Sequence, residues 1–346
     1  KQDAKQTLTR QRVGRDRQNA QRALTQVNAA IDTGDYAPPK TIVFREWADR
    51  WLASLQRERS TVRSYVSTIG YAKRAFGDVS VRHLTTEDLH RLLGIMAKEE
   101  LSAGTQRKHL RVLGGCIQSA VVAGYAAKNP VRLLPNAEKP RPHKRESAYF
   151  TDAELSAIAA VMDDDDPYKP LFKMALLTGA RLGELSAATW GDVDMLDKIL
   201  HIRWSYTDGV VKRPKSHERR DIEINGDVVA LLGEQYRRHS NPDDDKLVFP
   251  GATKSGYLSA DMPRRTLYAA MERAGVDRVG PTGEKRTFHS FRHSFARTVL
   301  EAGQPIFWLS RHLGHSSVSV TENAYGHWSR DAHRRVADEL EGVFAV

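Results

Sequence analysis

Hydrophobic residues recur at helical spacing over a long stretch that begins at Thr41. Its first apolar positions follow the i, i+3, i+4, i+7 pattern of an amphipathic helix: Phe44, Trp47, Ala48 and Trp51. Glycine, proline and capping residues interrupt the pattern at five places: Ser60–Thr61, Gly77–Asp78, Thr85–Thr86, Ser102–Gly104 and Asn129–Pro130. We therefore expect a domain of four or five helices over residues 41–135.

The first 40 residues carry a shorter version of the same pattern. Small and apolar residues lie at helical spacing between Ala23 and Ile31, within a segment rich in arginine and glutamine. Gly34, Pro38 and Pro39 then interrupt the helix. Residues 1–40 are therefore predicted to form a basic helix followed by a linker.

The pattern changes again after residue 135. Residues 136–150 hold two prolines and five basic side chains without apolar periodicity, which predicts a linker. Thr151 is a good N-cap for the helix that follows it. Short β-rich segments then occur at 199–204, 209–213 and 220–224, and helical patterns return at 226–239 and 262–274. We expect a second domain over 151–346, and a protein that is mainly α with a small antiparallel β-sheet (α+β).

Composition and charge narrow the class of protein. The net charge of +10 and the pI near 9.6 favour a polyanionic partner, either nucleic acid or an anionic membrane surface. We expect no membrane-spanning helix, because no stretch of about 18 apolar residues occurs. The single cysteine, Cys116, cannot form an internal disulfide and no signal peptide is visible, so we expect a cytoplasmic protein.

One predicted helix, over residues 105–113, is basic on one side. Its Leu110 and Leu113 would face a core, and its cations would lie on the opposite side, where they can contact phosphates. A solvated basic face is the alternative explanation. The candidate DNA contacts on this helix and on the linker are Arg107, Lys108, Arg111, Arg141, Lys144 and Arg145.

Four short stretches place cationic or nucleophilic side chains beside glycines or within apolar helices: TGARLGEL (178–185), RPKSHERR (213–220), FHSFRH (288–293) and HLGHSSVSVTENAYGH (312–327). Arg181 follows a glycine at a turn into a helix, and Glu184 lies one turn later, where it can orient the arginine. His289 and Arg292 are three residues apart and share a face if the segment is helical. Taken singly, each is more often an ordinary surface or core residue.

The order of these residues is more specific than any one of them. Arg, Lys, His-x-x-Arg, Gly-His and Tyr, over the 145 residues from Arg181 to Tyr325, resemble the signature of the tyrosine recombinase (phage integrase) family. The resemblance covers roughly residues 41–330 and implies a helical core-binding domain followed by a catalytic domain. One departure is Ser216, where relatives often have a threonine after the lysine. By motif match, the catalytic positions are Arg181, Lys215, His289, Arg292, His315 and Tyr325.

The chemistry of these side chains suits the transfer of a phosphodiester. Arg181 and Arg292 can clamp the phosphate, because a guanidinium binds phosphate bidentately and keeps its charge; we therefore expect no metal and no cofactor. Tyr325 as nucleophile would store the bond energy in a phosphotyrosine, so DNA could be rejoined without ATP. The absence of a P-loop motif agrees with this.

The resemblance also implies roles for the remaining residues. Lys215 would be the general acid for the departing 5′ oxygen, His289 would take the tyrosine proton, and His315 would donate to the phosphate. The reaction would pass through a 3′-phosphotyrosine and a Holliday junction. It would integrate or excise a mobile element, of the type carried by actinobacterial phages.

The resemblance further implies double-stranded DNA at attachment sites as the partner, and a homotetramer on paired sites. An excision-directionality factor or a host DNA-bending protein would assist. Apolar residues recur at helical spacing in the tail that follows Tyr325, and the family exchanges this segment between protomers. The alternative is that the tail folds back on its own domain. The tail positions are Ala332, Val336, Leu340 and Val343.

Several alternatives remain open on the sequence. A chromosome or plasmid resolution recombinase shares the chemistry, a relaxing topoisomerase shares the nucleophile, and a DNA-binding protein on the same scaffold would not cleave. A zinc site is a further alternative, but it lacks thiolate partners; its ligands would be His289, His293, His312 and His315. Residues 1–40 resemble the helix that trails an arm-binding domain, which was either removed or never present.

Overall fold

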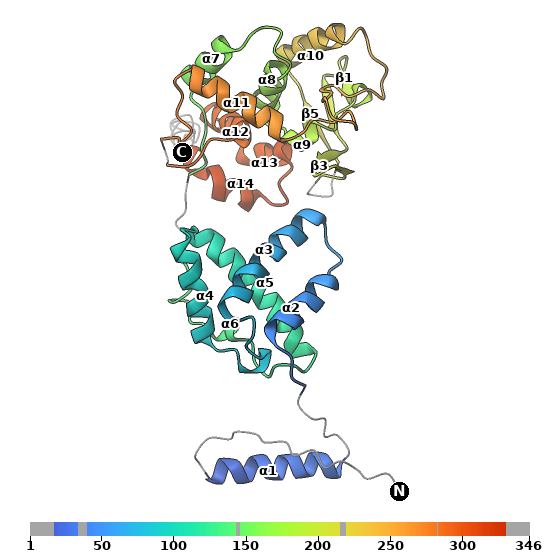
Figure 1. The fold of residues 1–346 in the computed structure, drawn as a ribbon. Coiled ribbons are helices and arrows are strands. Elements are labelled where there is room, and N and C mark those ends of the chain that lie inside the picture. Colours follow the sequence, from blue (N-terminus) through green and yellow to red (C-terminus); the bar gives the residue numbers. More distant parts are fainter. Residues whose placement is uncertain (1–16, 34–39, 143–145, 215–218, 282, 330–346) are drawn as a thin grey trace, which may run out of the picture. The chain divides into compact units, whose positions relative to one another are not determined.

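The computed structural model describes residues 17–33, 40–142, 146–214, 219–281 and 283–329. Three predicted site residues, Lys144, Arg145 and Lys215, and the predicted exchange tail within 330–346 lie outside the described residues. The chain divides into two compact units, Lys1–His143 and Lys144–Val346 (Figure 1). Each unit is described by itself.

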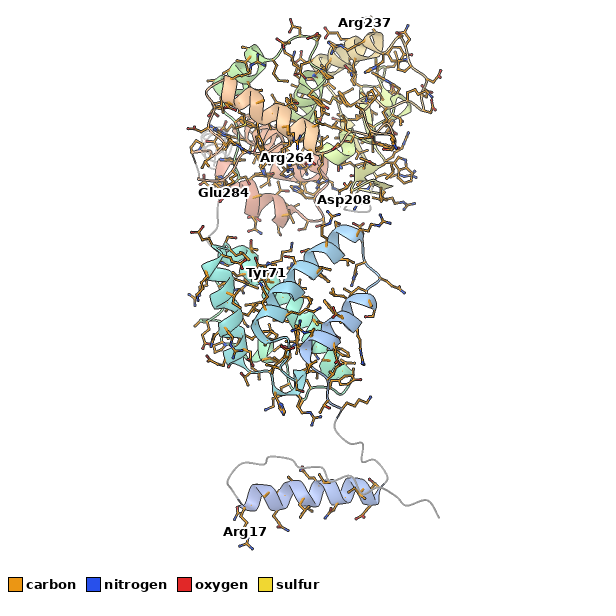
Figure 2. The ribbon with its side chains drawn as sticks, viewed as in Figure 1. Arg17, Tyr71, Asp208, Arg237, Arg264 and Glu284 are labelled. Carbon is orange, nitrogen blue, oxygen red and sulfur yellow. The ribbon has the colours of Figure 1, made fainter. Side chains whose placement is uncertain are left out.

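The first unit is helical (Figure 1). Its N-terminal helix α1 (Arg17–Asp32) exposes most of its side chains, beginning with Arg17 (Figure 2). The helices that form the body of the unit are α2 (Phe44–Ala53), α3 (Arg59–Phe76), α4 (Thr86–Lys98), α5 (Ala103–Val122) and α6 (Pro130–Leu133), with a 3-10 turn η1 at Val81–His83.

The predicted breaks lie close to the observed helix ends. Gly77 follows the last residue of α3. The N-cap of α4 is Thr85, whose backbone N–H and hydroxyl both donate to Asp88, at 3.0 and 3.1 Å. α3 begins at Arg59, so the break predicted at Ser60–Thr61 lies within its first turn and is wrong.

Apolar faces of these helices form one core. Phe44 of α2 packs edge-on against Phe76 of α3, with ring centroids 4.8 Å apart. Cys116 of α5 is fully buried in the same core, and its carbonyl accepts a hydrogen bond from the Trp47 indole at 3.0 Å. As the sequence predicts, Leu110 and Leu113 of α5 are buried.

The second unit has helices and small sheets side by side, and both contribute to an apolar core (Figure 1). Its longer helices are α7 (Asp152–Val161), α8 (Lys169–Thr178), α10 (Gly226–Arg238), α11 (Asp261–Arg273), α12 (His289–Glu301), α13 (Ile306–Leu313) and α14 (Val318–Tyr325). The short turns are α9 (Leu182–Leu185), η2 (Trp190–Asp192) and η3 (Gly326–Ser329). As predicted, Thr151 caps α7, and its hydroxyl accepts from the backbone N–H of Glu154.

The strands form two antiparallel sheets. β1 (Val193–Asp194), β2 (Ile199–Ile202) and β5 (Arg220–Glu223) make a three-stranded sheet in the order β1-β2-β5. β3 (Ser205–Thr207) and β4 (Val210–Lys212) pair separately as a hairpin. The mainly α class with small antiparallel sheets is thus confirmed.

The sequence places Lys215 between the β-rich segments 209–213 and 220–224, which suggests a hairpin, but the strands of these two segments do not pair with each other. β4 pairs with β3 and not with β5, because Asp208 and Gly209 have positive φ angles of 53° and 81° and form a tight Asp-Gly turn. The segment that contains Lys215 therefore joins strands of two different sheets. Among the described residues, no helix is long and apolar enough to cross a membrane.

Candidate active site

Two glycines let the chain turn so that the candidate site residues converge. Gly179 ends α8 and Gly314 ends α13, both in the left-handed conformation, with φ of 63° and 64°. A Cβ at Gly179 would lie 2.6 Å from a ring carbon of Phe295, and one at Gly314 would lie 2.9 Å from the side chain of Arg220. These close approaches bring the start of α9 and the α13–α14 connection toward α12, which lies among these helices in Figure 1.

Arg181 lies at the N-cap of α9, and its guanidinium donates to Glu184 Oε1 at 2.8 Å. Glu184 is 1% exposed and also binds Arg220, which donates to its two carboxylate oxygens at 2.9 and 2.7 Å. Burial alone would raise the pKa of Glu184, but hydrogen bonds from Arg220 and the charges of Arg220 and Arg181 hold it at about 2. One buried carboxylate therefore orients two arginines.

Arg220 was not singled out from the sequence. It lies on β5, and its Nε donates to the carbonyl of His312 at 2.9 Å. Its side chain is 9% exposed and connects the sheet to α9 and to the end of α13. The sequence could have indicated this inward position, because side chains along a strand point alternately to its two faces. Arg220 is two and four residues before the buried Ile222 and Ile224 and therefore faces inward with them.

Arg292 of α12 is 2% exposed and is held by backbone carbonyls. It donates to Gly179 O at 2.8 Å and to Leu313 O at 2.6 Å, and its Nη2 also donates to His315 Nε2 at 3.0 Å. Burial and the charge of Arg181 lower the pKa of Arg292 to about 9, so it remains charged at neutral pH. Among the described residues, Nε of Arg292 has no hydrogen-bond partner.

His315 follows Gly314 and faces Arg292. Because Arg292 can only donate, Nε2 of His315 accepts, and its Nδ1 carries the proton that binds the hydroxyl of Thr321 at 2.7 Å. Burial and the charges of Arg292 and Arg181 lower the pKa of His315 to about 4. The histidine is therefore neutral at pH 7.

His289 is the first residue of α12 and keeps an exposed edge. Desolvation by its crowded surroundings and the charges of Arg292 and Arg181 nevertheless lower the pKa of His289 to about 4. Its ring lies perpendicular to that of His293 one turn later, with centroids 4.7 Å apart.

Tyr325 is the last residue of α14 and is 2% exposed. Its hydroxyl lies 2.7 Å from Nδ1 of His293, and its ring stacks on Trp328 with centroids 5.4 Å apart. Burial raises the pKa of Tyr325, while the charges of Arg292 and Arg181 lower it in part. The positive charges of both arginines therefore act on Tyr325.

His293 entered the sequence interpretation only as a zinc ligand, and its contact with Tyr325 was missed. The zinc alternative loses support because the ring nitrogens of these histidines bind other groups. His293 binds Tyr325, His312 donates from Nε2 to Thr178 O at 2.9 Å, and His315 binds Arg292. The helical spacing of His289, Arg292 and His293 was the available signal, because residues three and four apart share a face.

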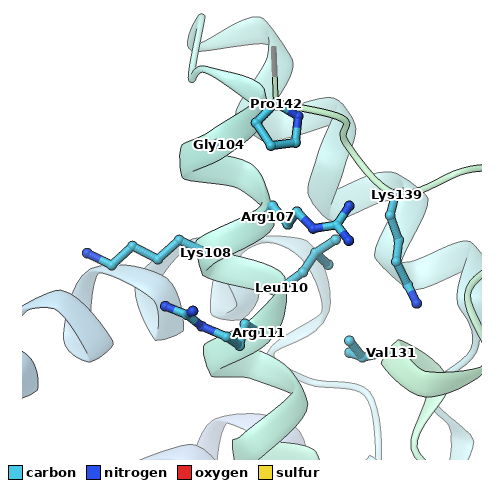
Figure 3. A pocket seen from close by; sticks show the side chains of 8 residues that line it. All are labelled: Gly104, Arg107, Lys108, Leu110, Arg111, Val131, Lys139 and Pro142. Carbon is cyan, nitrogen blue, oxygen red and sulfur yellow. The ribbon is translucent and has the colours of Figure 1, made fainter. Parts of the chain in front are cut away.

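The predicted DNA contacts that fall within the described residues lie on exposed positions of α5 and after α6. Arg107, Lys108, Arg111 and Lys139 line a hollow of about 490 Å³. Figure 3 shows Arg107 extending from α5 toward the segment that carries Lys139, while Lys108 extends to the other side of α5. Arg107 also donates to Pro140 O at 3.2 Å, which fixes its direction. Arg141 is exposed.

Known proteins of the same fold carry out DNA recombination. Residues 148–331 match the phage integrase family. A putative prophage phiRv2 integrase of Mycobacterium tuberculosis is 27% identical over 302 residues, which are 85% of this chain and 76% of that protein. The Tn1549 transposon integrase, solved in complex with transposon right end DNA, has a TM-score of 0.74 at 17% identity and covers 87% of this chain and 100% of its own. A lambda integrase tetramer bound to a Holliday junction has a TM-score of 0.66 at 20% identity, covering 88% and 89%.

The second unit holds a buried tyrosine on which the charges of two arginines act, and the chain has the fold of the solved integrases. The family match extends over more than half of the chain. This protein belongs to the phage integrase family and is a site-specific tyrosine recombinase.

Proposed function

We propose that this recombinase is an integrase that cuts and rejoins double-stranded DNA through a covalent bond between Tyr325 and a 3′ phosphate. The observation that carries the proposal is the position of Tyr325, whose buried hydroxyl lies near the charges of Arg292 and Arg181. A phosphate held by these arginines would lie within reach of the tyrosine oxygen. The strand-exchange steps follow from repeating this cleavage on paired sites through a Holliday junction.

Each remaining residue has a role in this proposal. Arg181 and Arg292 clamp the phosphate and stabilise the charge that develops on its oxygens. The buried Nε of Arg292, which lacks a partner among the described residues, supports this role because a buried donor normally has an acceptor. His315 donates to the phosphate after its ring reorients, and Lys215 protonates the departing 5′ oxygen. Glu184 holds Arg181 in place.

A covalent-adduct assay on nicked DNA tests the proposal directly. The wild-type protein should form an adduct that survives denaturation, because the phosphotyrosine bond is covalent. Tyr325→Phe should bind DNA with the same affinity and form no adduct, since only the hydroxyl is removed. An adduct with this variant would refute the assignment, and binding without any wild-type adduct would favour a non-cleaving DNA-binding protein.

We propose that both units contact the duplex, one through the basic side chains of α5 and the linker and one through the arginine clamp. Four copies would assemble on two paired attachment sites in the cytoplasm of a bacterial host. An excision-directionality factor or a host DNA-bending protein would control the direction. The domain boundaries at residues 41–135, 136–150 and 151–346 belong to this proposal, with the basic linker following the DNA.

The tail after Tyr325 would link neighbouring copies in that tetramer. Deleting residues 337–346 should leave binding to a single site nearly unchanged and should weaken synapsis of two sites, because the apolar positions of the tail would no longer be exchanged. Gel-shift titration on one-site and two-site DNA measures both effects. Normal synapsis by the truncated protein would mean that the tail folds onto its own domain.

A further inference from the structure

The hydroxyl of Tyr325 has a specific, half-buried partner that the family motif does not include. Nδ1 of His293 lies 2.7 Å from the hydroxyl, and the two rings meet at 63° with centroids 5.6 Å apart. Trp328 stacks on the tyrosine ring, with an interplanar angle of 14°. Two aromatic side chains therefore hold the tyrosine.

The length of this contact fits a hydrogen bond between the hydroxyl and the ring nitrogen. A neutral imidazole accepts at Nδ1 when its own proton is on Nε2. Transfer of the phenolic proton to His293 requires this tautomer, with the hydroxyl as the donor. Burial lowers the pKa of His293 to about 3 and raises the pKa of Tyr325, so both groups are uncharged at neutral pH.

The histidine assigned to the tyrosine proton on sequence grounds was His289. Among the residues that the structure describes, His289 makes no recorded hydrogen bond to Tyr325. His293 lies one helical turn further along α12, and its contact with the hydroxyl has the length of a good hydrogen bond. The geometry therefore favours His293 over His289.

We propose that His293 is a catalytic residue that holds the hydroxyl of Tyr325 and takes its proton as the tyrosine attacks DNA. In this step the bond from Tyr325 Oη to phosphorus forms and the bond from phosphorus to the 5′ oxygen breaks. The phenolic proton moves to Nδ1 of His293, and the departing 5′ oxygen receives a proton from a separate acid. Rejoining reverses each transfer. The inference rests on the proposed function of Tyr325.

DNA binding would make His293 a better proton acceptor. Burial is the main cause of its low pKa, and among the neighbouring groups that lower it further only Arg292 is charged at neutral pH. An anionic phosphate bound by Arg292 would offset this charge and favour the protonated imidazole. The free protein would thus keep the tyrosine neutral, and the substrate would promote its activation.

Two substitutions separate proton transfer from positioning. His293→Leu removes the acceptor, whereas His293→Asn keeps an acceptor oxygen near the place of Nδ1 but cannot carry the proton. We expect both variants to form the covalent adduct at least about 10²-fold more slowly than wild type, at unchanged DNA affinity. His239→Asn, on α10 away from the site, is the matched control and should react at the wild-type rate. A wild-type rate for His293→Asn would overturn proton transfer by His293.

A DNA substrate with sulfur in place of the scissile 5′ oxygen shows on which side of the reaction His293 acts. A thiolate leaves without a proton, so Lys215→Ala should recover on this substrate if Lys215 is the acid. His293→Leu and His293→Asn should stay slow, because the attacking tyrosine still has to lose its proton. Recovery of the His293 variants would show that they act on the leaving group and would overturn the inference. Absence of any wild-type adduct would refute the proposed function as well, whereas a normal adduct rate in both His293 variants would refute this inference alone.

Discussion

The two units of the chain differ in the burial of the basic side chains that we expect to act on DNA or to hold the fold. On α5 of the first unit, Arg107, Lys108 and Arg111 are exposed around a hollow, and the core below them is apolar. In the second unit, Arg286 and Arg292 are each 2% exposed. Buried arginines are rare unless every charge has a partner.

This difference separates two uses of positive charge. An exposed cation attracts phosphates at long range and is screened by salt, so it contributes to affinity more than to geometry. A buried cation tied to backbone carbonyls cannot move away when charge develops on the substrate, so it stabilises the transition state without reorganisation. We therefore expect substitutions in the first unit to change binding, and those in the second unit to change catalysis and folding.

The largest effect should come from Arg292. Arg292→Ala should lower the rate of covalent cleavage by about 10²- to 10³-fold, the scale for losing a transition-state charge contact, while DNA affinity changes little. Arg292→Lys should also be slow, because an ammonium lacks the planar fork of donors with which the guanidinium binds Gly179 O and Leu313 O and could also bind a phosphate. Single-turnover kinetics measure the effect, and the control is Arg297→Ala on the same helix, whose side chain pairs with Glu301. A cleavage rate of Arg292→Ala within a few-fold of wild type would show that Arg292 does not stabilise the transition state.

The next largest effect should be a loss of folding stability when Arg286 is replaced. Arg286 donates to Tyr149 O, Asp277 O and both carboxylate oxygens of Glu154. Arg286→Leu should lower the free energy of unfolding by about 3 kcal/mol, because Glu154 and the carbonyls lose their donor. The exposed pair of Arg264 with Asp261 is the comparison, and Arg264→Leu should cost less than about 1 kcal/mol. Equal costs in denaturant titrations would contradict the contrast between buried and exposed cations.

Acid should destabilise the second unit, because several of its histidines are held neutral in the fold. Burial lowers the pKa of His312 to about 4 and that of His293 to about 3, so these histidines stay neutral in the folded chain. The unfolded chain binds their protons below about pH 6.5, and stability is therefore lost as the pH falls from 6.5 toward 4. Between pH 6.5 and 5 we expect a loss of about 2 kcal/mol for each histidine.

Denaturant titrations at pH 7 and pH 5 check this expectation. His312→Gln should show a smaller loss than wild type, because its amide can still donate to Thr178 O but does not titrate. The same pH dependence of stability in wild type and variant would show that His312 does not cause the loss of stability in acid.

The smallest effects should come from the exposed cations of α5. Lys108→Gln or Arg111→Gln should weaken DNA binding only a few-fold and lower the slope of log affinity against log salt by about one each. Their adduct rate at saturating protein should stay at the wild-type value. Lys98→Gln at the end of α4 is the control and should leave the slope unchanged. An unchanged slope in the α5 variants would mean that these side chains form only a solvated face.

The sequence predicted most of the helices because their apolar positions repeat with the helical period, as in α2 and α5. It also selected side chains that the fold brings together, such as Arg181, Arg292 and Tyr325, because their order along the chain is specific. It did not reveal how the strands pair, since β3 and β4 are three residues each and only the Asp208–Gly209 turn marks their hairpin.

The residues missed in the site are those whose function depends on a partner distant in sequence. Arg220 binds Glu184, 36 residues away, and His293 binds Tyr325, 32 residues away. A pattern within one strand or helix shows that such a side chain faces inward, but it does not identify the group that it meets. Packing of separate elements decides that, and it is set by the whole fold.

The buried cysteine of the first unit can be used to follow the opening of that unit. Cys116 is the only thiol of the sequence, it is fully buried in α5, and burial raises its pKa to about 12. Alkylating reagents need an accessible thiolate, so labelling should require that the helical unit opens. The rate of labelling then measures the opening of that unit alone. In the folded protein, a dye would label an introduced surface cysteine and leave the buried native thiol unreacted.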